Sequence, residues 1–103
     1  MPVKPIPDAP TADPLHYTVE FENADVRILR IKYPAHSKGN MHDHPHSVTV
    51  MLTGGKLRGT KPDGKSNTSD SVKGLAIWEE AGPHQMENIG AEDFEAVRIE
   101  LKR

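Results

Sequence analysis

The sequence predicts an all-β sandwich or barrel, and three observations support this fold class. The chain has 103 residues, which is enough for one domain and leaves little room for a second. All eight glycines follow residue 38 and separate short β-prone stretches, as turn residues do. No stretch of ten residues keeps the 3.6-residue period of a helix. Eight short strands are therefore expected, at Tyr17–Glu22, Val26–Tyr33, Ser47–Thr53, Lys56–Thr60, Asn67–Val72, Leu75–Trp78, His84–Asn88 and Phe94–Leu101.

Proline is concentrated at the N-terminal end, where positions 2, 5, 7, 10 and 14 are all proline. Because each proline fixes φ and lacks a backbone N–H, the sequence excludes a helix and a central strand there. Residues 1–15 are therefore expected to form an extended arm, and residues 16–103 a single β-barrel domain.

Two local patterns indicate how the strands are used. In the last strand Val97, Ile99 and Leu101 alternate with Arg98 and Glu100, which is typical of a half-buried strand. Residues 61–65 read Lys-Pro-Asp-Gly-Lys, in which proline presets φ for a turn and glycine accepts a positive φ. The strands on either side of this turn are therefore expected to form a hairpin.

Composition narrows the classes of function. The net charge of −2 provides no positive field for a polyphosphate, so nucleic acid is an unexpected partner. The chain has no cysteine, so any metal must bind to nitrogen or oxygen. No apolar run approaches the roughly 18 residues that span a membrane, and the first twenty residues lack the apolar segment of a secretory signal. A soluble, cytoplasmic protein is expected, although a mature form with its signal removed would look the same.

The histidines carry the clearest chemical signal, because four of the six fall within residues 36–46. His42 and His44 are two positions apart, so on an extended strand both imidazoles point to one side. Such a pair can bind a metal, although histidines in a solvated loop give the same pattern. Neutral imidazoles in an apolar interior need hydrogen bonds or a metal. If the strand continues past Pro45, the same face carries the apolar residues Val48, Val50 and Leu52.

These residues resemble the two motifs of the cupins, small β-barrels of the jelly-roll type. The resemblance covers roughly residues 26–101. It implies an all-β, small jelly-roll (double-stranded β-helix) cupin barrel with a proline-rich extended N-terminal arm, and a metal held by His42, His44 and His84. The first motif matches at His42, His44 and Gly55, and the second, with one residue missing between Gly82 and His84, at Gly74, Gly82, His84 and Asn88.

The departures from the family pattern bear on the site. His36 stands where the first motif has glycine, and Val48 stands where many cupins carry the Glu that is a fourth metal ligand. Valine offers no lone pair, so the resemblance implies a set of three histidines. Three neutral imidazoles suit one divalent transition metal, whether Fe, Zn, Ni, Cu or Co, and leave open positions for a substrate. His46 and Glu80 are the candidate catalytic residues, with the neighbouring Glu79 as the alternative to Glu80, and they would assist proton transfer at the barrel mouth.

Three functions compete. The first is a metal-dependent oxidoreductase that resembles the three-histidine dioxygenases of the family, or an isomerase-type enzyme, acting on a small organic molecule. The second is a non-catalytic cupin that binds a small ligand, with a structural metal or none. The third, an oligonucleotide-binding barrel, is disfavoured because the chain has only five aromatic residues and a negative net charge. By analogy with other small cupins, and because the core is thin, a homodimer is expected.

Overall fold

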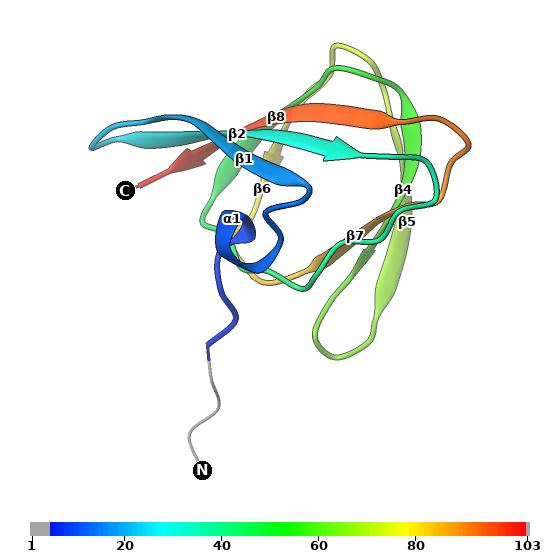
Figure 1. Cartoon of the computed structure of the whole chain (residues 1–103), viewed down its shortest axis with the longest axis horizontal. Coiled ribbons are helices and arrows are strands. Elements are labelled where there is room, and N and C mark those ends of the chain that lie inside the picture. Colours follow the sequence, from blue (N-terminus) through cyan, green and yellow to red (C-terminus); the bar gives the residue numbers. More distant parts are fainter. Residues whose placement is uncertain (1–4, 103) are drawn as a thin grey trace.

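The computed structural model describes residues 5–102, which form two antiparallel β-sheets and one short helix (Figure 1). All eight predicted strands are present, and their bounds differ from the expected ones by at most one or two residues. The elements, in chain order, are α1 (Ala9–Ala12), β1 (Tyr17–Glu22), β2 (Val26–Tyr33), β3 (Ser47–Met51), β4 (Gly55–Thr60), β5 (Ser66–Ser71), β6 (Ala76–Glu79), β7 (Gln85–Asn88) and β8 (Phe94–Leu101).

The strands are distributed unequally between the two sheets. The larger sheet has the order β1-β2-β8-β3-β6 and the smaller one the order β5-β4-β7. The expected hairpin is confirmed, since β4 pairs with β5 and the Lys61 N–H donates to the Lys65 carbonyl at 2.8 Å across the turn. Gly64 in this turn has φ 87°, as the sequence pattern requires.

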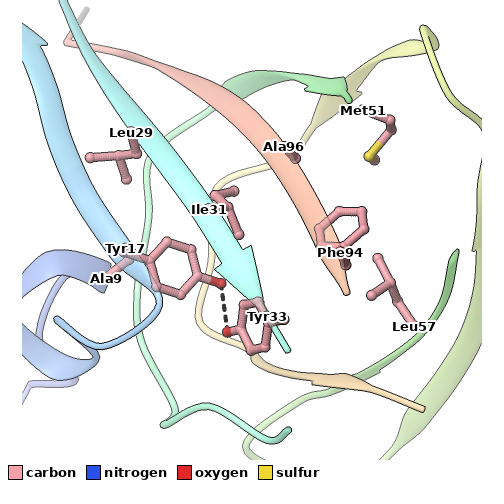
Figure 2. Close-up of a cluster of buried hydrophobic side chains, with 9 residues drawn as sticks. All are labelled: Ala9, Tyr17, Leu29, Ile31, Tyr33, Met51, Leu57, Phe94 and Ala96. Carbon is pink, nitrogen blue, oxygen red and sulfur yellow. Dashed lines mark hydrogen bonds between the residues drawn. The ribbon is translucent and has the colours of Figure 1, made fainter. Parts of the chain in front are cut away.

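The hydrophobic core lies between the two sheets (Figure 2). Leu57 of β4 joins a cluster whose other members come from the larger sheet and from α1. Burial of each large apolar side chain contributes about 1.5–3 kcal/mol, so a core of this size supports a small domain. Its members are Ala9, Tyr17, Leu29, Ile31, Tyr33, Met51, Leu57, Phe94 and Ala96.

Strand β8 is half-buried as expected, but its polar side faces the interior. Arg98 and Glu100 are only 3% and 1% exposed, whereas Val97 and Ile99 are partly exposed. Partners from other strands make this burial tolerable, because the attraction and hydrogen bonds within each pair offset the desolvation penalty that an unpaired buried charge would carry in full. Arg98 bonds the carboxylate of Glu79, and Glu100 accepts from Arg27 Nε at 2.7 Å.

The expected side-chain direction in β3 is wrong by one residue. Ser47, Thr49 and Met51 are buried, whereas Val48 and Val50 lie on the outer face of the sheet. The expectation required a strand that runs through Pro45, but β3 begins only at Ser47. The chain changes direction between the histidine pair and the strand, so the inward and outward positions exchange.

The extended conformation predicted for residues 1–15 is wrong at α1. Asp8 caps this helix by accepting from the Thr11 N–H at 3.2 Å, and Pro10 stands in its first turn. A proline is tolerated there because the first N–H groups of a helix have no intrahelical partner. Ala9 and Asp13 are buried, so this segment is part of the folded domain. The first four positions of the expected arm lie outside the described residues. Within residues 5–102, no helix is long and apolar enough to cross a membrane.

Candidate metal centre

The three histidines named as candidate ligands come together inside the barrel. The segment around His42 runs antiparallel to the segment before β7, and the backbones of His42 and His84 exchange two hydrogen bonds of 2.9 Å. His44 lies next to the same ring of His84. The ring centroids are 4.7 Å apart for His42 and His84, 4.5 Å for His44 and His84, and 6.1 Å for His42 and His44.

The hydrogen bonds of two of these rings leave a nitrogen lone pair available. The Nδ1 atoms of His42 and His44 lie 3.0 Å from the backbone carbonyls of Asn40 and Pro45. Because a carbonyl can only accept, each Nδ1 carries the proton and each Nε2 keeps its lone pair. The Nε2 atoms of His42, His44 and His84 are all buried and have no hydrogen-bond partner among residues 5–102.

Electrostatics keep the three imidazoles neutral. Burial lowers the pKa of His42 to about 4 and the pKa of His84 to about 2. Burial also lowers the pKa of His44, and the nearby Arg98 cation acts in the same direction on all three rings. Metal ligands must be deprotonated, so these shifts favour metal binding at neutral pH.

The donor set fits a transition metal in residue type, tautomer and charge, but its rings stand slightly too far apart. Within residues 5–102, no group of three or more His, Asp or Glu side chains is arranged to hold a metal ion as it stands. With metal–nitrogen distances of about 2.0–2.1 Å, rings that share a metal have centroids roughly 4.5–5.5 Å apart. The separation of 6.1 Å between His42 and His44 exceeds this range, whereas the other two separations meet it.

The buried carboxylate beside the histidines belongs to Glu79, which the sequence left as the alternative to Glu80. Glu79, at the end of β6, accepts from the Thr49 hydroxyl at 3.0 Å and from the Arg98 guanidinium. Burial alone would raise the pKa of Glu79, but the charge and hydrogen bond of Arg98, together with the hydrogen bond of Thr49, outweigh it and hold the pKa below its usual value. The carboxylate is therefore ionised at neutral pH.

The site opens to solvent through two adjoining cavities at the barrel mouth. One has a volume of about 520 Å³ and is lined by His44, His84, Glu79 and Lys61, among others. The second has a volume of about 710 Å³, and His84, Glu79, Lys61 and Met86 are among its lining residues. A small organic molecule can therefore reach two of the three histidines from outside.

Comparison with solved structures identifies the fold. A cupin domain from Bordetella pertussis matches with a TM-score of 0.78 and 29% identity, over 84% of this chain and 92% of that one. The chain folds as a small cupin. A cupin family protein from Methanocaldococcus jannaschii has a TM-score of 0.64 and 16% identity over 82% and 79% of the two chains. A double-stranded β-helix domain protein from Klebsiella pneumoniae has the same TM-score and 19% identity over 81% and 72%. No protein-family model and no curated protein matches the sequence.

The two predicted catalytic residues lie at the rim of this cupin rather than among the histidines. His46 stacks on Trp78 with ring centroids 5.5 Å apart, and its Nδ1 lies 3.5 Å from Glu80 Oε2. Their side chains are 47% and 77% exposed. Glu80 lines the first mouth cavity. Of the two neighbouring glutamates, Glu79 therefore points into the barrel and Glu80 points to solvent.

His16, for which the sequence suggested no function, belongs to the wall behind the histidines, which consists of Asp13, His16, Tyr17 and Tyr33. Its Nδ1 lies 2.8 Å from the buried carboxylate of Asp13, and its ring stacks on Tyr33 at 4.2 Å. The Tyr33 hydroxyl donates to the Tyr17 hydroxyl at 2.9 Å, and the Tyr17 ring lies 4.7 Å from His42. Residue spacing could not reveal this chain of contacts, because it depends on how α1 packs against the barrel.

Proposed function

We propose that this cupin binds one divalent transition metal, Fe, Zn, Ni, Cu or Co, through His42, His44 and His84. The observation that supports the proposal is the set of three buried Nε2 atoms without a hydrogen-bond partner in residues 5–102. A buried polar atom left unsatisfied costs about 1–3 kcal/mol, so three together need an explanation. A shared metal provides one, because it would satisfy all three lone pairs at once.

We propose further that the bound metal serves a dioxygenase-like or isomerase-type reaction on a small organic molecule. When bound, the metal would supply Lewis-acid or redox chemistry at the base of the mouth cavities. Lys61 lines both cavities and can attract a substrate with a negatively charged group. The predicted part of Glu80 and His46 in proton transfer is supported by their position, because Glu80 lines the first mouth cavity and His46 Nδ1 lies 3.5 Å from Glu80 Oε2.

The first experiment is elemental analysis of the untagged full chain, before and after metal removal and reconstitution. We expect close to one transition metal per chain, and a sharp loss of metal in His42→Ala and His84→Ala. His16→Ala provides the control, because His16 bonds Asp13 rather than the other rings. Equal metal content in all three variants and the wild type would exclude the site.

A non-catalytic cupin that binds a small ligand is the second candidate. The separation of 6.1 Å between the rings of His42 and His44 favours it, because this arrangement does not hold a metal as it stands. The reconstitution experiment distinguishes the two. If the protein takes up no metal, and a thermal-shift screen of small organic acids gives stabilisation, the binding function is supported instead.

We also propose that the protein is a homodimer in which the outer faces of the larger sheet meet. One apolar row crosses all five strands of this sheet in direct register. Large contiguous apolar patches are uncommon on monomers. A two-fold axis that lies in the interface and crosses the middle of the row would place the row against the same row of the second subunit. The row consists of Phe21, Ile28, Ile99, Val48 and Trp78.

The cytoplasmic location expected from the sequence stays a prediction.

A further inference from the structure

We propose that Glu79 is a fourth ligand of this metal, so that the donor set is three imidazole nitrogens and one carboxylate oxygen. The inference rests on the proposed metal site, which it completes. Glu79 comes from β6, whereas His42 and His44 precede β3 and His84 precedes β7. Four separate features of the structure support the assignment.

The first feature is position. Glu79 is opposite Ser47 in the pairing of β6 with β3, so it lies next to the segment that carries His44. It lines both mouth cavities, as His84 does, and it shares the first of them with His44. The charge of Glu79 also acts on His44 directly. The carboxylate therefore faces the same space as two of the three rings.

The second feature is a free oxygen. Both hydrogen bonds to the Glu79 carboxylate, from Thr49 and from Arg98, end on Oε2. Oε1 takes part in none of the hydrogen bonds found within residues 5–102, and the side chain, 24% exposed, lines both mouth cavities. A carboxylate held by one oxygen keeps the lone pairs of the other available, and carboxylate oxygens bind divalent transition metals.

The third feature is the way Thr49 and Arg98 hold the side chain. Arg98 Nε lies 3.3 Å from Thr49 Oγ1, so the three side chains form a closed hydrogen-bonded group. Arg98 is 3% exposed and Thr49 is equally buried, which prevents the group from opening to solvent. Metal ligands are commonly fixed by such outer contacts, and their loss typically costs 10–100-fold in metal affinity.

The fourth feature is charge. The Arg98 cation acts on all three histidines, so it is close enough to repel a divalent ion among them. Three neutral imidazoles do nothing to offset this repulsion. The ionised Glu79 carboxylate pairs with Arg98 and faces the same cavity as His44 and His84, so it would interact favourably with both positive charges.

The test is a titration of the metal-free full chain with Co²⁺, followed by affinity and by the visible absorption of the bound ion. We expect Glu79→Gln to lower Co²⁺ affinity at least tenfold and to change the absorption spectrum, because one oxygen ligand is lost. Glu95→Gln is the matched control, since Glu95 also bonds an arginine, Arg30, at 2.9 Å and is not a lining residue of the mouth cavities. It should bind Co²⁺ as the wild type does.

Glu79→Gln leaves the charge of Arg98 buried without its partner. The thermal unfolding of this variant is therefore compared with that of the wild type, and a second pair of proteins is prepared, Arg98→Gln with and without Glu79→Gln. In the Arg98→Gln background, adding Glu79→Gln should again lower Co²⁺ affinity at least tenfold and change the spectrum. Unchanged affinity and spectrum in either comparison would overturn the proposal and leave Glu79 only as the counterion of Arg98. If the wild type itself takes up no Co²⁺, the proposed metal site fails instead.

Discussion

Gly39 provides a sharp test of how the wall behind the histidines is packed. A β-carbon at position 39 would overlap Asp13 Oδ2 and would lie 2.5 Å from the Tyr33 hydroxyl oxygen. Neither atom can move freely, because Asp13 bonds His16 at 2.8 Å and Tyr33 bonds Tyr17 at 2.9 Å. Gly39→Ala therefore forces the wall apart by roughly 1 Å. Overpacking costs about 1–3 kcal/mol and a lost hydrogen bond about 0.5–1.5 kcal/mol, so we expect a loss of about 2–4 kcal/mol.

Urea unfolding of the metal-free protein, followed by circular dichroism, measures this loss. Gly54→Ala is the control, because a β-carbon there meets nothing closer than the Ser71 carbonyl oxygen at 3.5 Å. We expect it to change the free energy of unfolding by less than about 1 kcal/mol. A loss below about 0.5 kcal/mol in Gly39→Ala would show that the wall yields easily and would refute the packing described above.

Three other changes test separate parts of the structure. Burial lowers the pKa of His42 to about 4 and that of His84 to about 2, so the folded state binds fewer protons than the unfolded state. The free energy of unfolding of the metal-free protein is therefore highest above about pH 6.5, and below this pH it falls by about 1.4 kcal/mol per pH unit for each such histidine. Thermal unfolding at pH 7 and pH 5 should show this fall, and the fall should be less steep in His42→Ala. His36 has φ 62°, and His36→Gly should raise the unfolding free energy by up to about 1 kcal/mol; a loss would contradict the strain. Val48→Glu should leave metal content unchanged but give monomers in light scattering, because Val48 lies in the apolar row on the outer face; a persistent dimer would exclude that interface.

Local patterns in the sequence were sufficient to predict the strands. Alternation and turn chemistry depend on residues near one another in the chain, and these gave the bounds of β1, β2 and β8 as the structure has them. The positive φ of His36 was not predicted, although His36 stands where the cupin motif has glycine. The meeting of His42, His44 and His84 was also expected, but only through the resemblance, because nothing local connects positions 44 and 84.

Contacts between distant residues were not predictable in the same way. Arg98 and Glu100 point inward only because Glu79 and Arg27 neutralise them from other strands. Hydrophobic periodicity cannot distinguish a polar face in water from a polar face whose charges are paired inside. Likewise α1 forms within a proline-rich segment because Asp8 caps it and Ala9 is buried, and the composition of the segment showed neither.

The exchange of inward and outward positions after Pro45 explains how a carboxylate comes to lie beside the histidines although β3 carries none. An inward Val48 would have placed an apolar branch beside the histidines. With β3 starting at Ser47, the inward position is instead Thr49, whose hydroxyl donates to Glu79 at 3.0 Å. A short hydroxyl on β3 thus holds a longer acidic side chain from the neighbouring strand β6, and Arg98 of β8 bonds the same carboxylate oxygen. The same shift turns Val48 outward into the apolar row of the larger sheet, so a single change of direction in the chain shapes both the interior site and the exterior surface.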